Sequence, residues 1–435
     1  MIARALVLSI WVASILAFRL DNSQLASDQY SRVIVISDMH GDADALLQSL
    51  YLAYKNVTGE SSVTPSDFIA LFRSYVDSPG SSVHPLYSGN DVALIQMGDL
   101  VDRGKQSLQC LKIMNATQAV TGFKTITLMG NHEIVPLIGD AIYDRLVHPE
   151  DDLVRDASLF DRHQGPMWDL IISATIPMVR WGPPPTLSVP ASPRSLSSTS
   201  TLFVHAGLTE EFLYRYNIVT PPARYKFPFG KACRDCILGT PLSNGSSPIS
   251  VEAFNRMVLH DLNSLSLGDL SDKYLVDWSP FTTRDFGQID IDCDSVDKLL
   301  ALFDVARIVV GHLPTMAHRV RTNCDGTIIL TDIAASRYIH GPAHESIPPT
   351  PGIVVLSAQS PDILTHIKAS YTNITANRYK NEDIWVEGAE RIHPINRWAI
   401  SFEQSVTRIS PRVIPPFPSR KRPRTDDSLT RSSDN

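Results

Sequence analysis

The sequence predicts an α/β fold in which helices cover β-sheets. Short runs of β-branched and aliphatic residues recur, most of them end in a polar turn that contains glycine, and segments with helical spacing separate the first four. Runs this short and this apolar are typical of strands buried on both faces. Strands that alternate with helices indicate α/β architecture. The predicted strands span residues 33–36, 92–97, 125–129, 202–204, 307–310, 327–330 and 353–356.

Helical segments follow the first two predicted strands. Residues 43–54 and 105–114 carry apolar side chains at helical spacing. The last three predicted strands lie closer together along the chain, which predicts a second sheet rich in hairpins. No internal repeat is visible, so the pattern does not indicate a repeat array.

The composition is that of a globular protein. The chain has 435 residues, of which 43% are hydrophobic and 20% are charged, and this excludes collagen and disorder throughout. A formal net charge of −7 argues against a protein that grips nucleic acid, because such proteins normally carry a basic excess. No run of about 20 apolar residues occurs, so we expect no spanning membrane helix.

The first twenty residues predict a secretory signal. Arg4 precedes an apolar run over residues 5–18, which only Ser9 and Ser14 interrupt. A run of about 14 residues is typical of a signal peptide and short for a spanning helix. We therefore expect a protein of the secretory pathway or the extracellular space. The alternatives are a membrane anchor formed by an uncleaved signal and a buried N-terminal helix.

Two further patterns bear on the compartment. Acceptor triplets for N-glycosylation begin at four residues, which agrees with secretion: Asn56, Asn115, Asn244 and Asn373. The five cysteines are too few for a disulfide scaffold, and their odd number leaves at least one thiol unpaired within the chain. Cys233 and Cys236 form a Cys-x-x-Cys without two further zinc ligands nearby, so we expect a local disulfide or two idle thiols.

The chain divides into a main domain and several additions. We expect the main domain over residues 30–375, with insertions or loops near 58–90, 182–201 and 209–276; the third follows a polar motif and is a candidate cap. Residues 376–410 form a C-terminal extension in this division. Residues 411–435 are rich in Pro, Ser, Arg and Asp and predict a disordered basic tail. Within it, residues 419–424 resemble a nuclear import patch, which conflicts with secretion, so we interpret them as a solvated tail.

Polar clusters follow five of the predicted strands. They occupy residues 38–42, 98–104, 130–133, 205–207 and 311–312. Ligands of open α/β sheets bind beyond the carboxyl ends of the strands, so these clusters are expected to converge on one site.

The clusters contain the side chains of a metal site. Oxygen and imidazole ligands without thiolates suit Mn, Fe or Zn better than Ca, and argue against structural zinc. Six ligands exceed the need of one tetrahedral ion, so two ions that share a carboxylate are the simplest arrangement. Two ions roughly 3.5–4 Å apart can clamp the attacking and leaving oxygens of a phosphoryl transfer and lower the pKa of a bridging water to about 7. The candidate ligands are Asp38, His40, Asp99, Asn131, His205 and His312.

Each of these residues alone has an ordinary explanation. Asp38 fits a helix cap, Asn131 fits a turn, and a lone histidine is more often a core or surface residue. Five clusters in succession are hard to obtain by accident, so the joint pattern decides. Four glycines are expected to let the backbone turn sharply beside the ions: Gly41, Gly98, Gly104 and Gly130.

The boxes resemble those of the calcineurin-like metallophosphoesterases, specifically the PPP-type protein phosphatases. GDxHG, GDxxDRG and GNHE stand here as Ser-Asp-Met-His-Gly over 37–41, as residues 98–104 and as residues 130–133. The fourth box reads His-Ala-Gly over 205–207 rather than His-Gly-Gly. With the segments 279–285 and 331–334 it resembles the Shewanella-like protein phosphatase branch. The resemblance implies a four-layer α/β/β/α sandwich of two mixed sheets flanked by helices.

The resemblance also implies a role for each residue. Asp38, His40 and Asp99 would hold the first metal, and Asp99, Asn131, His205 and His312 the second, so that a hydroxide bridging the two ions attacks the phosphorus. His132 would protonate the leaving oxygen while Asp102 keeps it cationic. Arg103 would grip the phosphate as a planar fork, and Arg284 would be a second clamp. Two departures are Ser37 in place of Gly and the pair Thr282–Thr283 in place of aromatics.

The resemblance implies a metal-dependent phosphatase of phosphoproteins (on Ser/Thr or Tyr), with Mn as the most effective metal in vitro. One alternative is a hydrolase of small phosphate esters, such as nucleotides or dinucleoside polyphosphates, because the same core serves either substrate. Another alternative is a non-catalytic scaffold. The complete ligand set and the presence of His132 argue against it.

Overall fold

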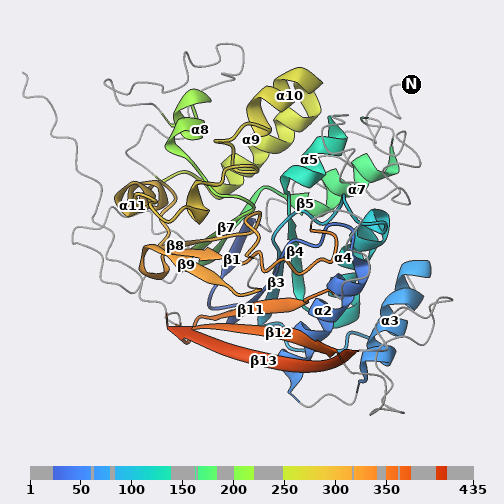
Figure 1. The fold of residues 1–435 in the computed structure, drawn as a ribbon. Helices are drawn as coiled ribbons and strands as arrows, with labels where there is room; N and C mark the ends of the chain where they lie inside the picture. The colour runs from blue at the N-terminus through green and yellow to red at the C-terminus, as the bar shows by residue number, and fades with distance from the viewer. Residues whose placement is uncertain are drawn as a thin grey trace, which may run out of the picture.

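The computed structural model describes residues 23–59, 63–78, 84–138, 162, 165–183, 200–219, 248–315, 318–339, 349–360, 363–373 and 398–408. The strands in these ranges form two mixed sheets (Figure 1). The seven-stranded sheet has the order β13-β12-β11-β2-β3-β4-β5. Its strands are β2 (Arg32–Ile36), β3 (Val92–Gln96), β4 (Lys124–Leu128), β5 (Thr175–Ile176), β11 (Gly352–Ser357), β12 (Ile363–Asn373) and β13 (Trp398–Arg408).

The six-stranded sheet has the order β1-β6-β7-β8-β10-β9. Strands β7, β8 and β10 run parallel, whereas β6 pairs antiparallel with β7 and β9 pairs antiparallel with β10. Only Pro177 separates β5 from β6, so the chain passes there from one sheet to the other. The strands are β1 (Gln24–Ala26), β6 (Met178–Gly182), β7 (Thr201–Val204), β8 (Arg307–Val310), β9 (Arg321–Asn323) and β10 (Ile328–Leu330).

Alternate residues of each buried strand pack into two different hydrophobic cores. Val33 and Val35 of β2 belong to a cluster that also contains Phe203 of β7 and Val309 of β8, so this cluster lies between the sheets. Their neighbours, such as Ile34, pack in a second cluster with residues of the helices. Strands covered on both faces need apolar side chains on both, which explains why the runs are continuous rather than alternating.

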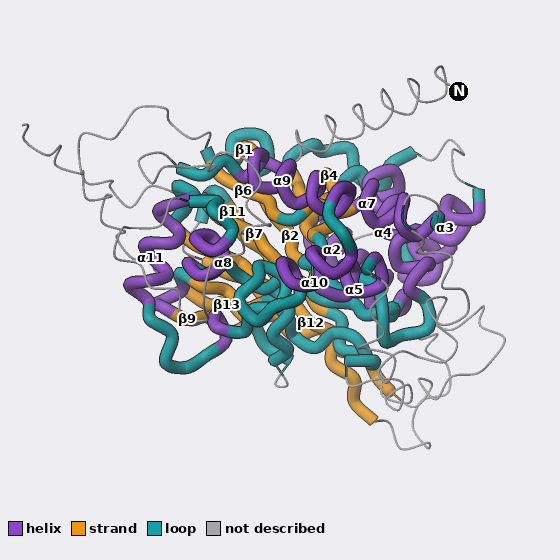
Figure 2. Tube along the Cα trace, turned by 90° about the horizontal axis from the view of Figure 1, so that it is seen from above, coloured by secondary structure: helices purple, strands orange, loops and turns teal. Residues whose placement is uncertain are grey.

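Helices cover the outer face of each sheet and complete the four layers. The helices α2, α3, α4 and α7 gather beside the seven-stranded sheet, and α8 to α11 lie on the side of the six-stranded sheet (Figures 1 and 2). A short helix, α5, begins directly after β4. The bounds are α2 (Ala43–Thr58), α3 (Pro65–Asp77), α4 (Ser107–Thr121), α5 (Asn131–Leu137), α7 (Pro166–Ala174), α8 (Glu210–Arg215), α9 (Val251–Ser264), α10 (Leu267–Tyr274) and α11 (Cys293–Leu302), with 3-10 turns η4 (Asp285–Gly287) and η5 (Cys324–Gly326).

The α/β class and the layered arrangement of two mixed sheets are therefore confirmed, and each of the seven predicted strands is a strand. The prediction that the last three strands build a hairpin-rich second sheet is wrong. Strands β8 and β10 are parallel neighbours in the six-stranded sheet, whereas β11 pairs with β2 in the other sheet. Residues 331–351 separate β10 from β11, a connection long enough to cross between the sheets.

Several additions to the main domain carry secondary structure. The insertion near 58–90 contains α3, which begins with a capping box of Thr64 and Asp67 and buries Phe68 and Phe72. The insertion near 209–276 contains α8, α9 and α10. The predicted C-terminal extension contains β13, which pairs along β12 and extends the sheet. The signal segment 1–20, the tail 411–435, Asn244, Cys233 and Cys236 lie outside the described residues, as does most of 182–201.

Other expectations fall on described residues. Asn56 and Asn115 lie on α2 and α4, and Asn373 ends β12. Sequence analysis did not predict the disulfide that joins Cys293 at the start of α11 to Cys324 in η5. Cys110 is buried and forms no disulfide with another described cysteine. None of the described helices is long and apolar enough to cross a membrane.

Candidate metal centre

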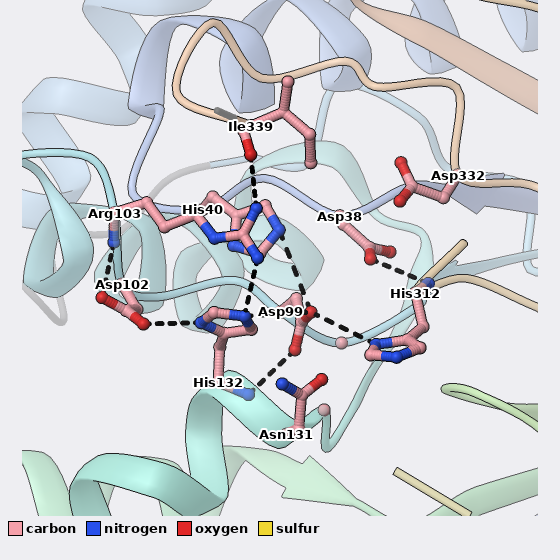
Figure 3. Close-up of polar contacts among 12 residues, drawn as sticks. Asp38, His40, Asp99, Asp102, Arg103, Asn131, His132, His312, Asp332 and Ile339 are labelled. Carbon is pink, nitrogen blue, oxygen red and sulfur yellow. Dashed lines mark hydrogen bonds and ion pairs between the residues drawn. The ribbon is translucent and has the colours of Figure 1, made fainter. Parts of the chain in front are cut away.

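The six predicted ligands come together at one edge of the two sheets. Asp38, Asp99 and Asn131 follow the parallel strands β2, β3 and β4, while His205 and His312 follow β7 and β8. The carboxyl ends of these strands meet, so loops far apart in sequence share one site (Figure 3). All six side chains are buried. Buried carboxylates and imidazoles that lie this close together need a cation or hydrogen-bond partners, which the apolar core does not provide.

Asp99 lies at the centre of the cluster. Its Oδ1 is 3.2 Å from His205 Nε2. Its Oδ2 is 3.9 Å from His40 Nε2 and 4.0 Å from His312 Nδ1. Two groups with ligand atoms close enough to hold an ion share this carboxylate: one is His40, Asp99 and His132, and the other is Asp99, His205 and His312. This geometry fits two ions on either side of one carboxylate.

The environment of His205 has the character of a metal ligand. Its Nδ1 lies 2.8 Å from the carbonyl oxygen of Met97, so this nitrogen carries the hydrogen and donates it. Its Nε2 then directs a lone pair toward Asn131 Oδ1 at 3.1 Å and Asp99 Oδ1 at 3.2 Å. Three acceptors face one another, which requires a cation or a proton among them. A histidine that donates its second N–H to a backbone carbonyl is the usual arrangement in metal sites.

Three other predicted ligands leave a buried atom without a hydrogen bond in the described part of the chain. These atoms are Asp38 Oδ1, His40 Nδ1 and His312 Nε2. Such atoms cost free energy unless something binds them. The second oxygen of Asp38 is occupied, because it accepts the backbone N–H of His312 at 2.8 Å. Asp38 Oδ1 is therefore free to bind an ion, whereas the ring nitrogens of His40 and His312 that face Asp99 are the opposite ones, Nε2 and Nδ1. These residues together offer the oxygen and imidazole ligands that fit a metal pair.

The pKa shifts agree with this assignment for His40 and His312, whereas for His205 burial is outweighed by the attraction of Asp99, which raises the pKa. Burial, followed by the charges of Arg103 and His132, lowers the pKa of His40 well below its usual value, and burial also lowers the pKa of His312. Both rings are thus neutral at pH 7, as ligation requires. Burial and then Asp332 and Asp99 raise the pKa of Asp38, which reflects crowded carboxylates. Burial alone would raise the pKa of Asp99, but His205 and His132 lower it.

Comparison with known families matches residues 31–316, more than half of the 435, to the calcineurin-like phosphoesterases. The chain belongs to this family. No curated protein matches the chain at a significant level.

Similar solved structures include a cold-active protein-tyrosine phosphatase of a psychrophilic Shewanella species, at 18% identity, 79% coverage of each chain and a TM-score of 0.49. They also include a protein serine/threonine phosphatase from Saccharomyces cerevisiae, at 12% identity, 80% coverage of this chain, 82% of that chain and a TM-score of 0.37. A diadenosine tetraphosphatase described as putative matches at 11% identity, 77% and 93% coverage and a TM-score of 0.29. At these values the likeness carries no argument about substrate.

Glu133 holds two boxes of the phosphoesterase together. Its Oε1 accepts the N–H groups of Leu100 and Val101 at 2.7 and 3.1 Å, and its Oε2 accepts those of Asp99 and Gly130 at 2.9 and 2.7 Å. Burial and the charge of Asp99 raise the pKa of Glu133, while the bonds from Gly130 and Leu100 lower it. Because all four neighbours of the carboxyl oxygens are N–H donors, a proton on Glu133 would find no acceptor among them. Glu133 is therefore a carboxylate. Sequence analysis gave this residue no role, although its spacing after Gly130 is that of a capping box.

The loops that carry the site adopt backbone conformations that most residues avoid. Left-handed φ angles of this kind persist only where the surroundings fix them, and they cluster at functional sites. Five residues of the predicted site have them: His40, Asp99, Asp102, Arg103 and His312.

Two glycines are required at the site for different reasons. Gly98 has a φ of +96°, and a Cβ there would lie 2.6 Å from His205 Nδ1. Gly130 has an ordinary φ of −103°, so the expectation that it permits a sharp turn is wrong. A Cβ at Gly130 would lie 2.2 Å from Asp99 Oδ1. Close approach of the backbone to the shared carboxylate therefore explains this glycine.

His132 lies between Asp102 and Arg103. Its Nδ1 is 2.6 Å from Asp102 Oδ2, and its Nε2 is 3.1 Å from Arg103 NH2. Guanidinium groups only donate, so Nε2 accepts here and Nδ1 donates to Asp102. Both ring nitrogens are engaged, unlike those of His40, which supports a role for His132 other than ligation. A proton on Nε2, which general-acid catalysis needs, requires Arg103 to turn away.

A second arginine fixes the loop that positions Arg103. Arg103 NH1 donates to the carbonyl oxygen of Ile339 at 2.5 Å. Two residues earlier, the buried Arg337 donates from Nε to Asp42 Oδ2 at 2.9 Å and from NH2 to Asp44 Oδ2 at 3.0 Å. These acids flank the start of α2, so the loop is tied to the first box. The sequence predicts neither contact of Arg337, since no motif connects residues 293 and 295 positions apart.

Asp332 is a further buried acid beside the site (Figure 3). Its Oδ1 accepts from Ser37 Oγ at 3.2 Å, which explains how serine fits where the related boxes have glycine. Burial raises the pKa of Asp332 to about 6, and the charge of Asp99 contributes. Arg284, the predicted second clamp, is exposed, and no described contact joins it to the six ligands. Its charge nevertheless contributes to the lowered pKa of His312.

We predict that Glu133→Gln loosens the metal centre. The amide presents an NH2 group where two backbone N–H groups need an acceptor, so the boxes separate. We expect a loss of about 10- to 100-fold in metal affinity or kcat/KM, as for other residues that support ligands. Metal titration and kinetics measure it. Glu211→Gln, the same change at a buried acid of α8, is the control. Values within twofold of the wild type would contradict the role of Glu133.

Proposed function

We propose that this phosphoesterase is a metal-dependent phosphatase that hydrolyses phosphomonoesters on proteins. One observation carries the proposal: the buried carboxylate of Asp99 lies among the predicted ligands His40, His205 and His312, and the pair His132–Asp102 and Arg103 lie directly beside it. Ligand groups, a candidate acid and a phosphate-binding cation thus occur within one site. The metal that best supports activity in vitro is proposed to be Mn, with Fe and Zn as the other candidates.

Two divalent ions held by the six ligands would supply an activated water and neutralise charge on the phosphate. Arg103 contributes the planar, bidentate fork that matches phosphate oxygens. In the structure this guanidinium is bound to His132 and Ile339. A phosphate oxyanion is a stronger acceptor than either, so substrate binding draws Arg103 away from the imidazole.

That movement frees the acid. Once Arg103 binds phosphate, Nε2 of His132 is no longer an acceptor for the guanidinium and can take a proton. Asp102, at 2.6 Å from Nδ1, orients the ring and stabilises its positive charge. His132 then donates the Nε2 proton to the oxygen of the leaving group. The residues therefore couple phosphate binding to protonation.

The combination of two sequence motifs supports a protein substrate. The boxes at 98–104 and 130–133 occur together, as in PPP-type protein phosphatases. The specificity of such a core lies in its loops, so Ser/Thr and Tyr phosphoesters are both tested below.

We also propose that the protein works in the secretory pathway or outside the cell. The disulfide between Cys293 and Cys324 supports this, because disulfides persist in oxidising compartments and are rare in the cytosol. The apolar run over residues 5–18 supports it independently.

His132→Asn separates catalysis from metal binding. Since His132 is proposed as the acid and not as a ligand, the variant should retain both metals and lose about a hundredfold or more in kcat. Metal analysis and steady-state kinetics measure the two properties. Asp99→Asn is the comparison and should lose metal and activity together. Turnover within a few fold of the wild type would remove His132 from the mechanism.

A substrate panel tests the proposed function itself. The purified protein is assayed with Mn²⁺, Fe²⁺ and Zn²⁺ against phosphoserine, phosphothreonine and phosphotyrosine peptides, nucleotides and dinucleoside polyphosphates. We expect phosphopeptides to be hydrolysed with the highest kcat/KM. Turnover of nucleotides alone would favour the small-ester alternative. No turnover with any metal would favour a scaffold.

A further inference from the structure

A polar groove lies between α2, α3 and α4, outside the metal centre. Its volume is about 310 Å³, and its charged and amide side chains are Asp44, Arg73, Lys105, Gln106, Gln109 and Lys112. None of the proposed ligands lines it. We call it the basic groove, after its three cations.

The charge of the basic groove differs from that of the whole protein. Arg73 and Lys112 are exposed, and Lys105 is half-buried. Within the part of the chain that the structure describes, neither Arg73 nor Lys112 forms an ion pair. The one acid, Asp44, is bound by Arg337 at 3.0 Å and so is already neutralised in part. On a chain with a net charge of −7, three cations around one groove form a local site for negative charge.

The basic groove adjoins the phosphate-binding loop. Lys105 is two residues from Arg103, so their Cα atoms are at most about 7 Å apart. Backbone hydrogen bonds from Gly104 to His40, at 2.9 Å, and from Gln106 to Gly41, at 3.1 Å, tie this loop to the first box. An extended peptide advances about 3.3 Å per residue. Acidic residues a few positions from a phosphorylated side chain can therefore reach the groove while the phosphate is at the metal centre.

We propose that the basic groove docks an acidic segment of the substrate protein, next to the phosphorylated residue. This rests on the proposed function, because the segment must be part of a phosphoprotein. Arg73 and Lys112 bind the carboxylates, Lys105 extends the positive charge toward Arg103, and the two glutamines offer hydrogen bonds to the peptide backbone. The contribution is electrostatic, so it acts on kcat/KM and declines with salt.

Two phosphopeptides test the proposal. They share the phosphorylated residue and its nearest neighbours, but one continues with four Glu on each side and the other with four Gln. We expect the wild type to prefer the Glu peptide about fivefold in kcat/KM at low salt, as exposed ion pairs allow, and to lose the preference near 0.5 M salt.

The matched variants locate the effect. Arg73→Gln/Lys112→Gln should hydrolyse both peptides equally, with unchanged activity on p-nitrophenyl phosphate, which is too small to reach the groove. Arg256→Gln/Lys298→Gln removes the same charge from exposed positions on α9 and α11 and should keep the preference. Two outcomes would overturn the docking role. One is equal kcat/KM of the wild type for the two peptides, and the other is an equal loss of the preference for the Glu peptide in both double variants.

A binding measurement keeps this test separate from the test of the function. Fluorescence anisotropy of the unphosphorylated Glu peptide reports docking without catalysis. Binding by the wild type that is lost in Arg73→Gln/Lys112→Gln supports the groove, and absence of binding overturns it. If neither phosphopeptide is hydrolysed, the proposed function fails and the anisotropy alone decides about the groove.

Discussion

The buried carboxylate of Asp99 is the constraint on which the site depends. It is 2% exposed, and ring nitrogens of four histidines lie within 4.0 Å of its oxygens. A carboxylate removed from water is costly unless positive charge lies next to it. The opposite pKa shifts of Asp99 and His205 reflect this requirement, because each group favours the charged form of the other. The bare Oδ1 of Asp38 and the imidazole nitrogens that converge on Asp99 fit divalent ions, which would supply this charge.

The surrounding backbone is shaped by this carboxylate. Glu133 gathers four N–H groups of the loops on either side of it, and Gly130 leaves room for its Oδ1. Left-handed φ angles at His40 and His312 direct their side chains from loops of different sheets toward the same point. The two packed sheets hold these strained loops in place, and this explains why a large apolar core supports a small polar site.

Much of this could be predicted from the sequence, and the reason is geometric. Strands buried on both faces give continuous apolar runs, and parallel strands end at a common edge, so polar residues after such runs had to meet. Asp332, Arg337 and the carbonyl of Ile339 could not be found in this way. They act through contacts with residues 236 to 295 positions away, and no local pattern encodes such pairs. The prediction that β11 belongs to the second sheet was wrong for a related reason, because spacing along the chain does not decide which sheet a strand joins.

Anomalous X-ray diffraction from crystals grown with Mn²⁺ tests the central claim most directly. The shared carboxylate predicts two anomalous peaks, one on each side of Asp99, with the first also near Asp38 and His40 and the second near Asn131, His205 and His312. A single peak beside Asp99 would contradict the account. So would the absence of any peak there in a crystal that binds Mn²⁺ at other positions.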